Sequence, residues 1–193
     1  VFLGFICGLT ILSRPSEVVC LIIPVLWGIK DGNSIREKFI VLYKYKVHVV
    51  VVASIIALFG LSQMLYWKIY TGKFLFYSYG GNAGEGFELF HPYIWEVLFS
   101  FRKGWLIYTP VMLFALIGFY FMYQKNRSVF YALFAYAVIN IYFVSSWSCW
   151  WYAQSFSQRA LIPSYPIMAI GLGYFLAWLN DQKSIIKRLG YAL

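Results

Sequence analysis

The side chains in this sequence that are suited to chemistry gather in one stretch, residues 145–166, which reads SSWSCWWYAQSFSQRALIPSYP. Its aromatic residues include Trp147, Trp150 and Trp151, and the cation Arg159 stands where the next apolar run begins. Sugars bind on aromatic faces, and phosphates bind the planar fork of an arginine. The composition therefore suggests a site for a phosphorylated, carbohydrate-like ligand at a membrane surface.

Gln158 adjoins Arg159 and joins the expected ligand-binding set. Each member also has a simpler interpretation. Tryptophans such as Trp147, Trp150 and Trp151 often form an aromatic belt at the membrane interface. An arginine at the end of a span often reaches toward lipid headgroups.

Arg14 is a further candidate because it interrupts a long apolar run, where an ionisable group is costly unless it is paired or hydrated. We expect it to contact a ligand phosphate, near the outer boundary of the membrane and close to Arg159. The main alternative is an internal ion pair with Glu17, which the i,i+3 spacing permits.

Glu88 and His91, three residues apart in FELFHP, are candidates for acid/base or acceptor-binding roles. The three cysteines lack metal-ligand spacing, and no His/Cys cluster, nucleotide-phosphate loop or Ser-His-Asp pattern is present, so we expect no metal ligands in this sequence. The net charge of +9 reflects membrane topology and does not indicate nucleic-acid binding.

The elements that must position these residues are membrane helices. Of the 193 residues, 62% are hydrophobic and only 12% are charged, which leaves too little polar surface for a soluble globule. We therefore expect an all-α, polytopic membrane protein that forms one transmembrane domain over residues 1–193.

Four apolar runs have the character of full spans, and we expect transmembrane helices there. Residues 1–29 are too long for one span and are interrupted at Arg14, so we expect a broken helix pair. Its second helix would have Pro15 in its first turn and Ser13 as its cap, and would end near Gly28. The expected full spans are residues 47–67, 105–123, 130–144 and 161–179.

The connecting segments fall into two classes. Residues 30–46 are basic and read as a solvated amphipathic loop, whereas residues 68–104 and 145–160 form two aromatic loops. The two alternate sides carry unequal positive charge, and the more basic side is predicted to be cytoplasmic. The aromatic loops would then face outward and meet. The predicted cytoplasmic cations are Lys30, Arg36, Lys38, Lys44, Lys46, Lys125, Arg127, Lys183, Lys187 and Arg188; those opposite are Lys68, Lys73, Arg102, Lys103 and Arg159.

The sequence begins with Val1 inside an apolar run, without an initiator methionine. We expect an N-terminal part, including further spans, to precede it.

Three segments together carry a resemblance: GLTILSRPSEVVCLIIPVLWGI, then YTGKFLFYSYG with FELFHP, and then SSWSCWWYAQSFSQRALIPSYPIMAIGLGYFLAWL. They resemble the C-terminal part of the membrane module of bacterial polyprenyl-phosphate-sugar glycosyltransferases of the C superfamily. Protein O-mannosyltransferases and the lipid A aminoarabinose transferase are similar. The chain departs from the family pattern at Ala153 and Ser157, where glycines are expected.

The resemblance implies a multi-span enzyme of the bacterial inner membrane that moves a sugar from an isoprenoid-phosphate carrier to an acceptor on the non-cytoplasmic face. Isoprenoid-phosphate-linked sugar and membrane lipid would be its partners. The family's catalytic acid, and any divalent cation it binds, would lie in the preceding N-terminal part, so the fragment would be inactive alone.

A second class of function remains open: a non-catalytic membrane protein, such as a flippase-like carrier of lipid-linked substrate or a structural subunit. A transporter usually has polar or broken segments near the membrane midplane in both halves. Because the later spans are almost wholly apolar, the sequence favours chemistry at the interface.

Overall fold

A computed structural model describes residues 1–76 and 85–182. The chain divides into two compact units, residues 1–85 and 86–193, which are described separately. The described residues are largely helical, and their one β feature is an isolated antiparallel bridge. Within them, three helices are long and apolar enough to cross a membrane: Lys46–Thr71, Arg127–Ser145 and Arg159–Asn180. This agrees with a helical membrane protein.

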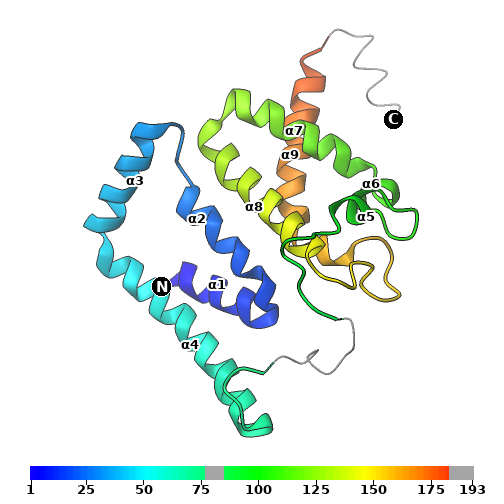
Figure 1. Ribbon diagram of the computed structural model, residues 1–193. Helices are drawn as coiled ribbons and strands as arrows, with labels where there is room; N and C mark the ends of the chain where they lie inside the picture. Colours follow the sequence, from blue (N-terminus) through cyan, green and yellow to red (C-terminus); the bar gives the residue numbers. More distant parts are fainter. Residues whose placement is uncertain (77–84, 183–193) are drawn as a thin grey trace. The chain divides into compact units, whose positions relative to one another are not determined.

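Unit 1 contains a long helix and a set of shorter ones (Figure 1). The long helix, α4, has 26 residues, contains the range 47–67 where a span is expected, and is long and apolar enough to cross a membrane. Thr71 is followed by Gly72, which adopts the left-handed conformation (φ 74°) and ends the helix as a glycine cap. The elements of unit 1 are α1 (Phe2–Ser13), the 3₁₀ helix η1 (Pro15–Leu21), α2 (Ile22–Leu26), α3 (Gly32–Lys44) and α4 (Lys46–Thr71).

Helix α1 packs against α4 through two glycines one turn apart. A Cβ atom added to Gly4 would lie 3.0 Å from the Val52 carbonyl oxygen, and one added to Gly8 would lie 2.2 Å from the Phe59 ring. Small residues four positions apart allow membrane helices to approach this closely. Gly4 faces Val52 and Gly8 faces Phe59, so the two helices run in the same direction.

The predicted break at Arg14 is confirmed. Arg14 has extended backbone angles (φ −153°, ψ 108°) between α1 and η1, and Pro15 occupies the first turn of the new helix. Because proline has no N–H and a fixed φ, it suits that position. The predicted cap at Ser13 is wrong, since its hydroxyl donates back to the Thr10 carbonyl (2.8 Å) and Arg14 stands at the N-cap.

The segment expected to be a solvated loop, residues 30–46, is instead mostly helix α3. Asp31 caps it, because its carboxylate accepts from the Ser34 backbone N–H (2.9 Å) while the Ser34 hydroxyl accepts from the Asp31 N–H (2.8 Å). This reciprocal capping box satisfies two backbone donors and starts the helix. A single residue, Tyr45, separates α3 from α4.

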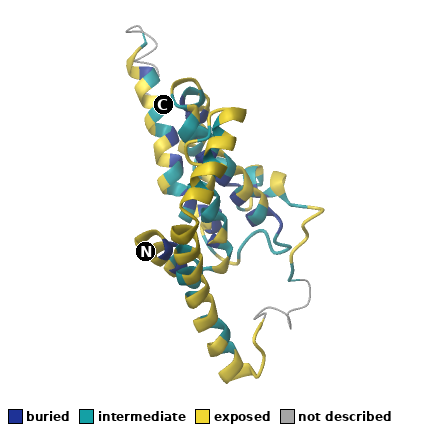
Figure 2. Cartoon of the chain, turned by 90° about the vertical axis from the view of Figure 1, so that its left-hand side faces the viewer, coloured by how far each residue is buried: buried dark blue, intermediate teal, exposed yellow. Residues whose placement is uncertain are grey.

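Unit 2 places two long apolar helices and one shorter one around a buried core (Figure 2). The span expected at 105–123 is divided, because the helix stops at Thr109 and resumes after Pro110. Helix α7 has 15 residues, or roughly 22 Å, which is shorter than a typical hydrocarbon core of roughly 30 Å. The elements of unit 2 are α5 (Ile94–Phe99), α6 (Trp105–Tyr108), α7 (Val111–Lys125), α8 (Arg127–Ser145), the 3₁₀ helix η2 (Arg159–Ser164) and α9 (Tyr165–Asn180).

Helices α7 and α9 form the closest contact in unit 2. A Cβ atom added to Gly118 would lie 1.8 Å from the Gly171 carbonyl oxygen, so the backbones meet where neither residue has a side chain. Phe119 of α7 lies beside this contact, 3.5 Å from a Cβ atom added to Gly171, and it is buried, as are Met122 of α7 and Met168 of α9. At one end of the unit, Lys125 pairs with Asp181 (3.4 Å). Residues 86–104 and the Trp-rich loop, residues 145–160, lie at the opposite end of unit 2.

Candidate functional site

The Trp-rich loop after α8 is held by a segment that is distant in the sequence. Phe87 and Trp147 form an antiparallel bridge: the Glu88 N–H donates to the Ser146 carbonyl (2.7 Å), and the Ser148 N–H donates to the Gly86 carbonyl (2.9 Å). The Phe87 and Trp147 rings meet edge to face, with centroids 5.1 Å apart. The pairing fixes the start of the loop.

Two more hydrogen bonds extend this contact along α8. The Tyr93 N–H donates to the Ser145 carbonyl (2.8 Å), and the Tyr142 hydroxyl donates to the Leu89 carbonyl. Residues 86–93 of the first aromatic loop thus meet the second loop, as the sequence predicts. Which side of a membrane this end of unit 2 occupies stays a prediction.

The middle of the Trp-rich loop turns sharply. Tyr152, Ala153 and Ser157 all adopt positive φ angles of 46°, 57° and 48°. Such angles favour glycine, because a Cβ atom crowds the following carbonyl. The resemblance called for glycines at Ala153 and Ser157, and both positions have the backbone that glycine favours. The loop makes this tight turn with alanine and serine at these two positions.

The predicted tryptophans do not form one flat platform. Trp150 and Trp151 are half-buried and perpendicular, with ring centroids 5.8 Å apart, while Trp147 packs on Phe87. The guanidinium carbon of Arg102 lies 4.4 Å from the centroid of the Trp151 ring, a cation–π contact.

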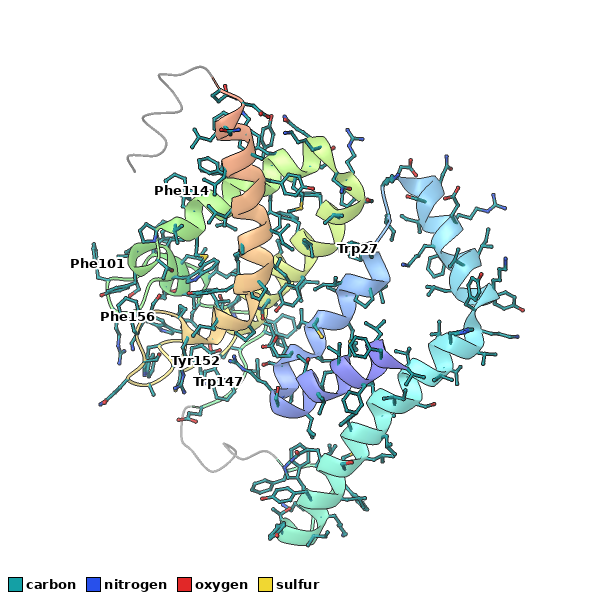
Figure 3. The ribbon with its side chains drawn as sticks, turned by 180° about the vertical axis from the view of Figure 1, so that it is seen from behind. Trp27, Phe101, Phe114, Trp147, Tyr152 and Phe156 are labelled. Atoms are coloured by element: carbon teal, nitrogen blue, oxygen red, sulfur yellow. The ribbon has the colours of Figure 1, made fainter. Side chains whose placement is uncertain are left out.

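Arg102 is a residue of this end of unit 2 that the sequence reasoning missed, because from the sequence it counts only among the cations opposite the cytoplasmic side. It follows α5 in the first loop and reaches Trp151 only because the two loops meet, so no local signal points to it. Figure 3 shows Phe101, Tyr152, Phe156 and Trp147 at this end of the unit, with Phe114 further along α7.

Arg159 is exposed at the start of η2, and in the described part of the chain it has no ion pair. The neighbouring Gln158 is 1% exposed, and neither its amide nitrogen nor its amide oxygen has a hydrogen-bond partner within the structure. The hydroxyl of Ser157, also buried, is likewise without one. Buried polar groups normally have partners, so this point at the base of the loop has unused capacity to bind water or a ligand.

Glu88 and His91, the two acid/base candidates, lie in the docked segment and are exposed. The Tyr93 hydroxyl donates to Glu88 Oε2 (2.9 Å), which favours the protonated phenol and raises the pKa of Tyr93. The two candidates are joined through the backbone, where the His91 N–H donates to the Glu88 carbonyl (3.1 Å). Glu88 is thus oriented by a neighbour, as a catalytic carboxylate would have to be.

Arg14 belongs to unit 1, and its guanidinium lies 3.9 Å from the buried carboxylate of Glu17. The internal pair considered as the alternative therefore exists. Arg159 belongs to unit 2, so the predicted approach of the two arginines stays a prediction.

Chemically, the loop end of unit 2 offers indole faces, a cation stacked on one of them, a second exposed cation and an oriented carboxylate. In the described residues, no group of three or more His, Cys, Asp or Glu side chains is placed to hold a metal ion. A comparison of the chain with protein-family models, curated proteins and solved structures found no match.

Proposed function

We propose that this chain belongs to an integral membrane glycosyltransferase that takes a sugar from an isoprenoid-phosphate carrier and passes it to an acceptor. The observation that carries the proposal is the loop end of unit 2. There, a Trp-rich loop is braced by a second loop, Arg102 stacks on Trp151, and Arg159 is exposed where α9's apolar run begins.

Sugar transfer from a carrier phosphate requires a cation at the phosphate and a surface that binds the sugar. The acceptor oxygen attacks the anomeric carbon, the bond from that carbon to the carrier phosphate oxygen breaks, and the acceptor's proton passes to a base. Charge builds on the leaving phosphate, so a fixed cation there stabilises the transition state more than the ground state. We assign that role to Arg159 and sugar stacking to Trp150 and Trp151, with Trp147 and Gln158 supporting the loop.

The membrane arrangement in this proposal is polytopic, with about four spans, and sits in the bacterial inner membrane. In this proposal, helices α6 and α7 together make a fourth crossing, in addition to those of α4, α8 and α9. The basic segment 30–46 and the turn at 125–127 face the cytoplasm, and the aromatic loops face outward, because cytoplasmic segments carry excess lysine and arginine.

Binding of the carrier is the direct test. The chain is reconstituted in nanodiscs of zwitterionic lipid and titrated with radiolabelled isoprenoid phosphate, with the uncharged isoprenol as a competitor. A charged hydrogen bond contributes roughly 1.5–3 kcal/mol, so Arg159→Ala should weaken binding about tenfold or more. Arg159→Lys keeps the charge but loses the fork, and should recover only part of it.

Arg127 supplies a matched control. It is exposed, as Arg159 is, and it lies over an aromatic ring as Arg102 does, 4.9 Å from the Tyr123 centroid, but at the opposite end of unit 2. Arg127→Ala should leave carrier binding unchanged. If Arg127→Ala and Arg159→Ala weaken carrier binding equally, the effect is one of general positive charge at the membrane, and the assignment of the carrier phosphate to Arg159 is refuted.

Turnover separates the enzyme from the non-catalytic alternative. In membranes from cells carrying the natural gene or its Arg159→Ala variant, loss of labelled sugar from the carrier lipid is followed over time. The variant should be slower by about a hundredfold or more. Carrier binding without any loss of sugar in the natural protein would favour a carrier or structural subunit.

A further inference from the structure

Helix α3 has an apolar face that is largely exposed among the described residues of unit 1. Ile35, Phe39, Leu42 and Tyr43 recur at the i, i+4, i+7, i+8 spacing of one helix face. Phe39 is 68% exposed, Tyr43 is 75% exposed, and none of the helix's residues is buried. In water this face would be unfavourable, so the helix requires a partner.

The position of α3 in the chain restricts what that partner is. Tyr45 alone separates it from α4, which is long and apolar enough to cross a membrane. One residue spans less than about 4 Å, so α3 must lie where α4 enters the bilayer. Tyr43 and Tyr45 carry the cations of Lys46 and Lys44 over their rings (5.2 and 5.6 Å), as is typical of side chains at the interface.

A second contact joins α3 to the C-terminal end of α2. The Lys38 ammonium donates to the Pro24 carbonyl (3.0 Å) and the Trp27 carbonyl (2.9 Å), and so satisfies the C-terminal end of α2. Trp27 is 48% exposed and is itself an interface-preferring residue. Figure 3 shows Trp27 at the end of α2 that leads into α3.

Charge indicates which lipids the surface fits. The segment 30–46 has five cations and two acids. Of these, Lys38 is bound to carbonyls at the end of α2, and Asp31 accepts the capping hydrogen bond of α3. The remaining cations are Lys30, Arg36, Lys44 and Lys46, against Glu37 alone. Anionic headgroups attract such basic segments.

We propose that α3 lies in the membrane interface, with its Ile35–Phe39–Tyr43 face in the headgroup and acyl boundary and its cations on anionic lipid headgroups. This is the arrangement of an interfacial amphipathic helix. It rests on unit 1 alone and is independent of the proposed enzymatic function.

The test places an environment-sensitive fluorescent amino acid at Phe39 or, on the opposite face, at Glu37 of the whole chain. Each variant is reconstituted in nanodiscs of phosphatidylcholine alone or mixed with phosphatidylglycerol, with nitroxide-labelled lipid as the quencher. The probe at position 39 should shift to the blue and be quenched by the lipid, more strongly with phosphatidylglycerol. The probe at 37 should remain accessible to iodide in water.

Charge variants complete the test. Arg36→Gln with Lys44→Gln should weaken the preference for phosphatidylglycerol about fivefold per cation, and raised salt should do the same to the natural chain. Lys68→Gln, at the far end of α4, is the control and should not alter the signal at 39. Equal water accessibility at 39 and 37 would overturn the proposal and restore a solvated segment. Lipid quenching that is the same in both lipid mixtures would overturn its anionic component.

Discussion

The contact between Gly118 and Gly171 holds α7 and α9 together, and adding a single methyl group tests it. In Gly118→Ala, the new Cβ would lie 1.8 Å from the Gly171 carbonyl oxygen and 2.5 Å from its carbon. Ordinary van der Waals contact begins near 3.4 Å, so the helices must separate by about 1.6 Å at this point. Both partner atoms belong to the backbone, and no side chain can rotate away.

The magnitude follows from two opposing effects. Alanine gains about 1 kcal/mol over glycine in a helix interior. Separation by this distance deprives side chains packed at the contact, such as the buried Phe119, of a quarter to a half or more of their contact energy. Overpacking of this kind costs roughly 1–3 kcal/mol and sometimes more. The displacement here is large, so we take about 3 kcal/mol, the upper end of that range. After the gain of about 1 kcal/mol from alanine, the expected net loss is about 2 kcal/mol, or a fall in Tm of about 4–8 °C.

Gly173 provides the control on the same helix as Gly171. A Cβ atom added there meets nothing within 4 Å, so Gly173→Ala gains helix propensity without a clash. Thermal unfolding in detergent, followed by tryptophan fluorescence, should rank the proteins with Gly173→Ala at or above the natural chain and Gly118→Ala clearly below it. A Gly118→Ala protein as stable as the natural chain would refute the backbone contact.

Three further changes test other parts of the structure. Ser157→Gly should stabilise the chain by about 0.5–1 kcal/mol in thermal unfolding, because its φ is positive and its buried hydroxyl has no partner; Ser155→Gly, at an ordinary φ, should not. Glu88→Gln should lower the pKa of Tyr93, measured by NMR titration. Because the folded pKa is raised above the unfolded one, the stability it contributes is lost as pH rises through it, so the natural chain should lose stability above about pH 10 and the variant should lose less. Asp31→Ala should increase hydrogen exchange over α3. Because the hydrogen bond from the Ser34 backbone lowers the Asp31 pKa, the natural cap should be lost as pH falls below about 3.8, whereas Asp31→Asn should keep the helix at all pH values.

Helix α4 and the break at Arg14 could be predicted because their signals are local. An apolar run of span length and an Arg-Pro pair act through propensity and backbone geometry alone. Pro110 carried the same kind of signal, since a proline disfavours the helix before it, but the apolar run across it suggested one continuous span. The high charge of residues 30–46 favours a solvated loop, although the apolar residues have helical spacing. The Asp31 and Ser34 pair that caps α3 is a local signal that could have predicted the helix.

The arrangement of the site depended on contacts that no local pattern encodes. The composition of the Trp-rich loop indicated sugar and phosphate chemistry, yet the stacking of Arg102 on Trp151 required the bridge between Phe87 and Trp147, some 60 residues apart. The turn within the loop was easier to anticipate from the sequence. Ala153 and Ser157 stand where a glycine was expected, and both have a backbone suited to glycine. A non-glycine residue at a positive φ costs stability, and such backbone outliers persist only where the surrounding structure determines them; here the loop is fixed at its start by the Phe87–Trp147 bridge.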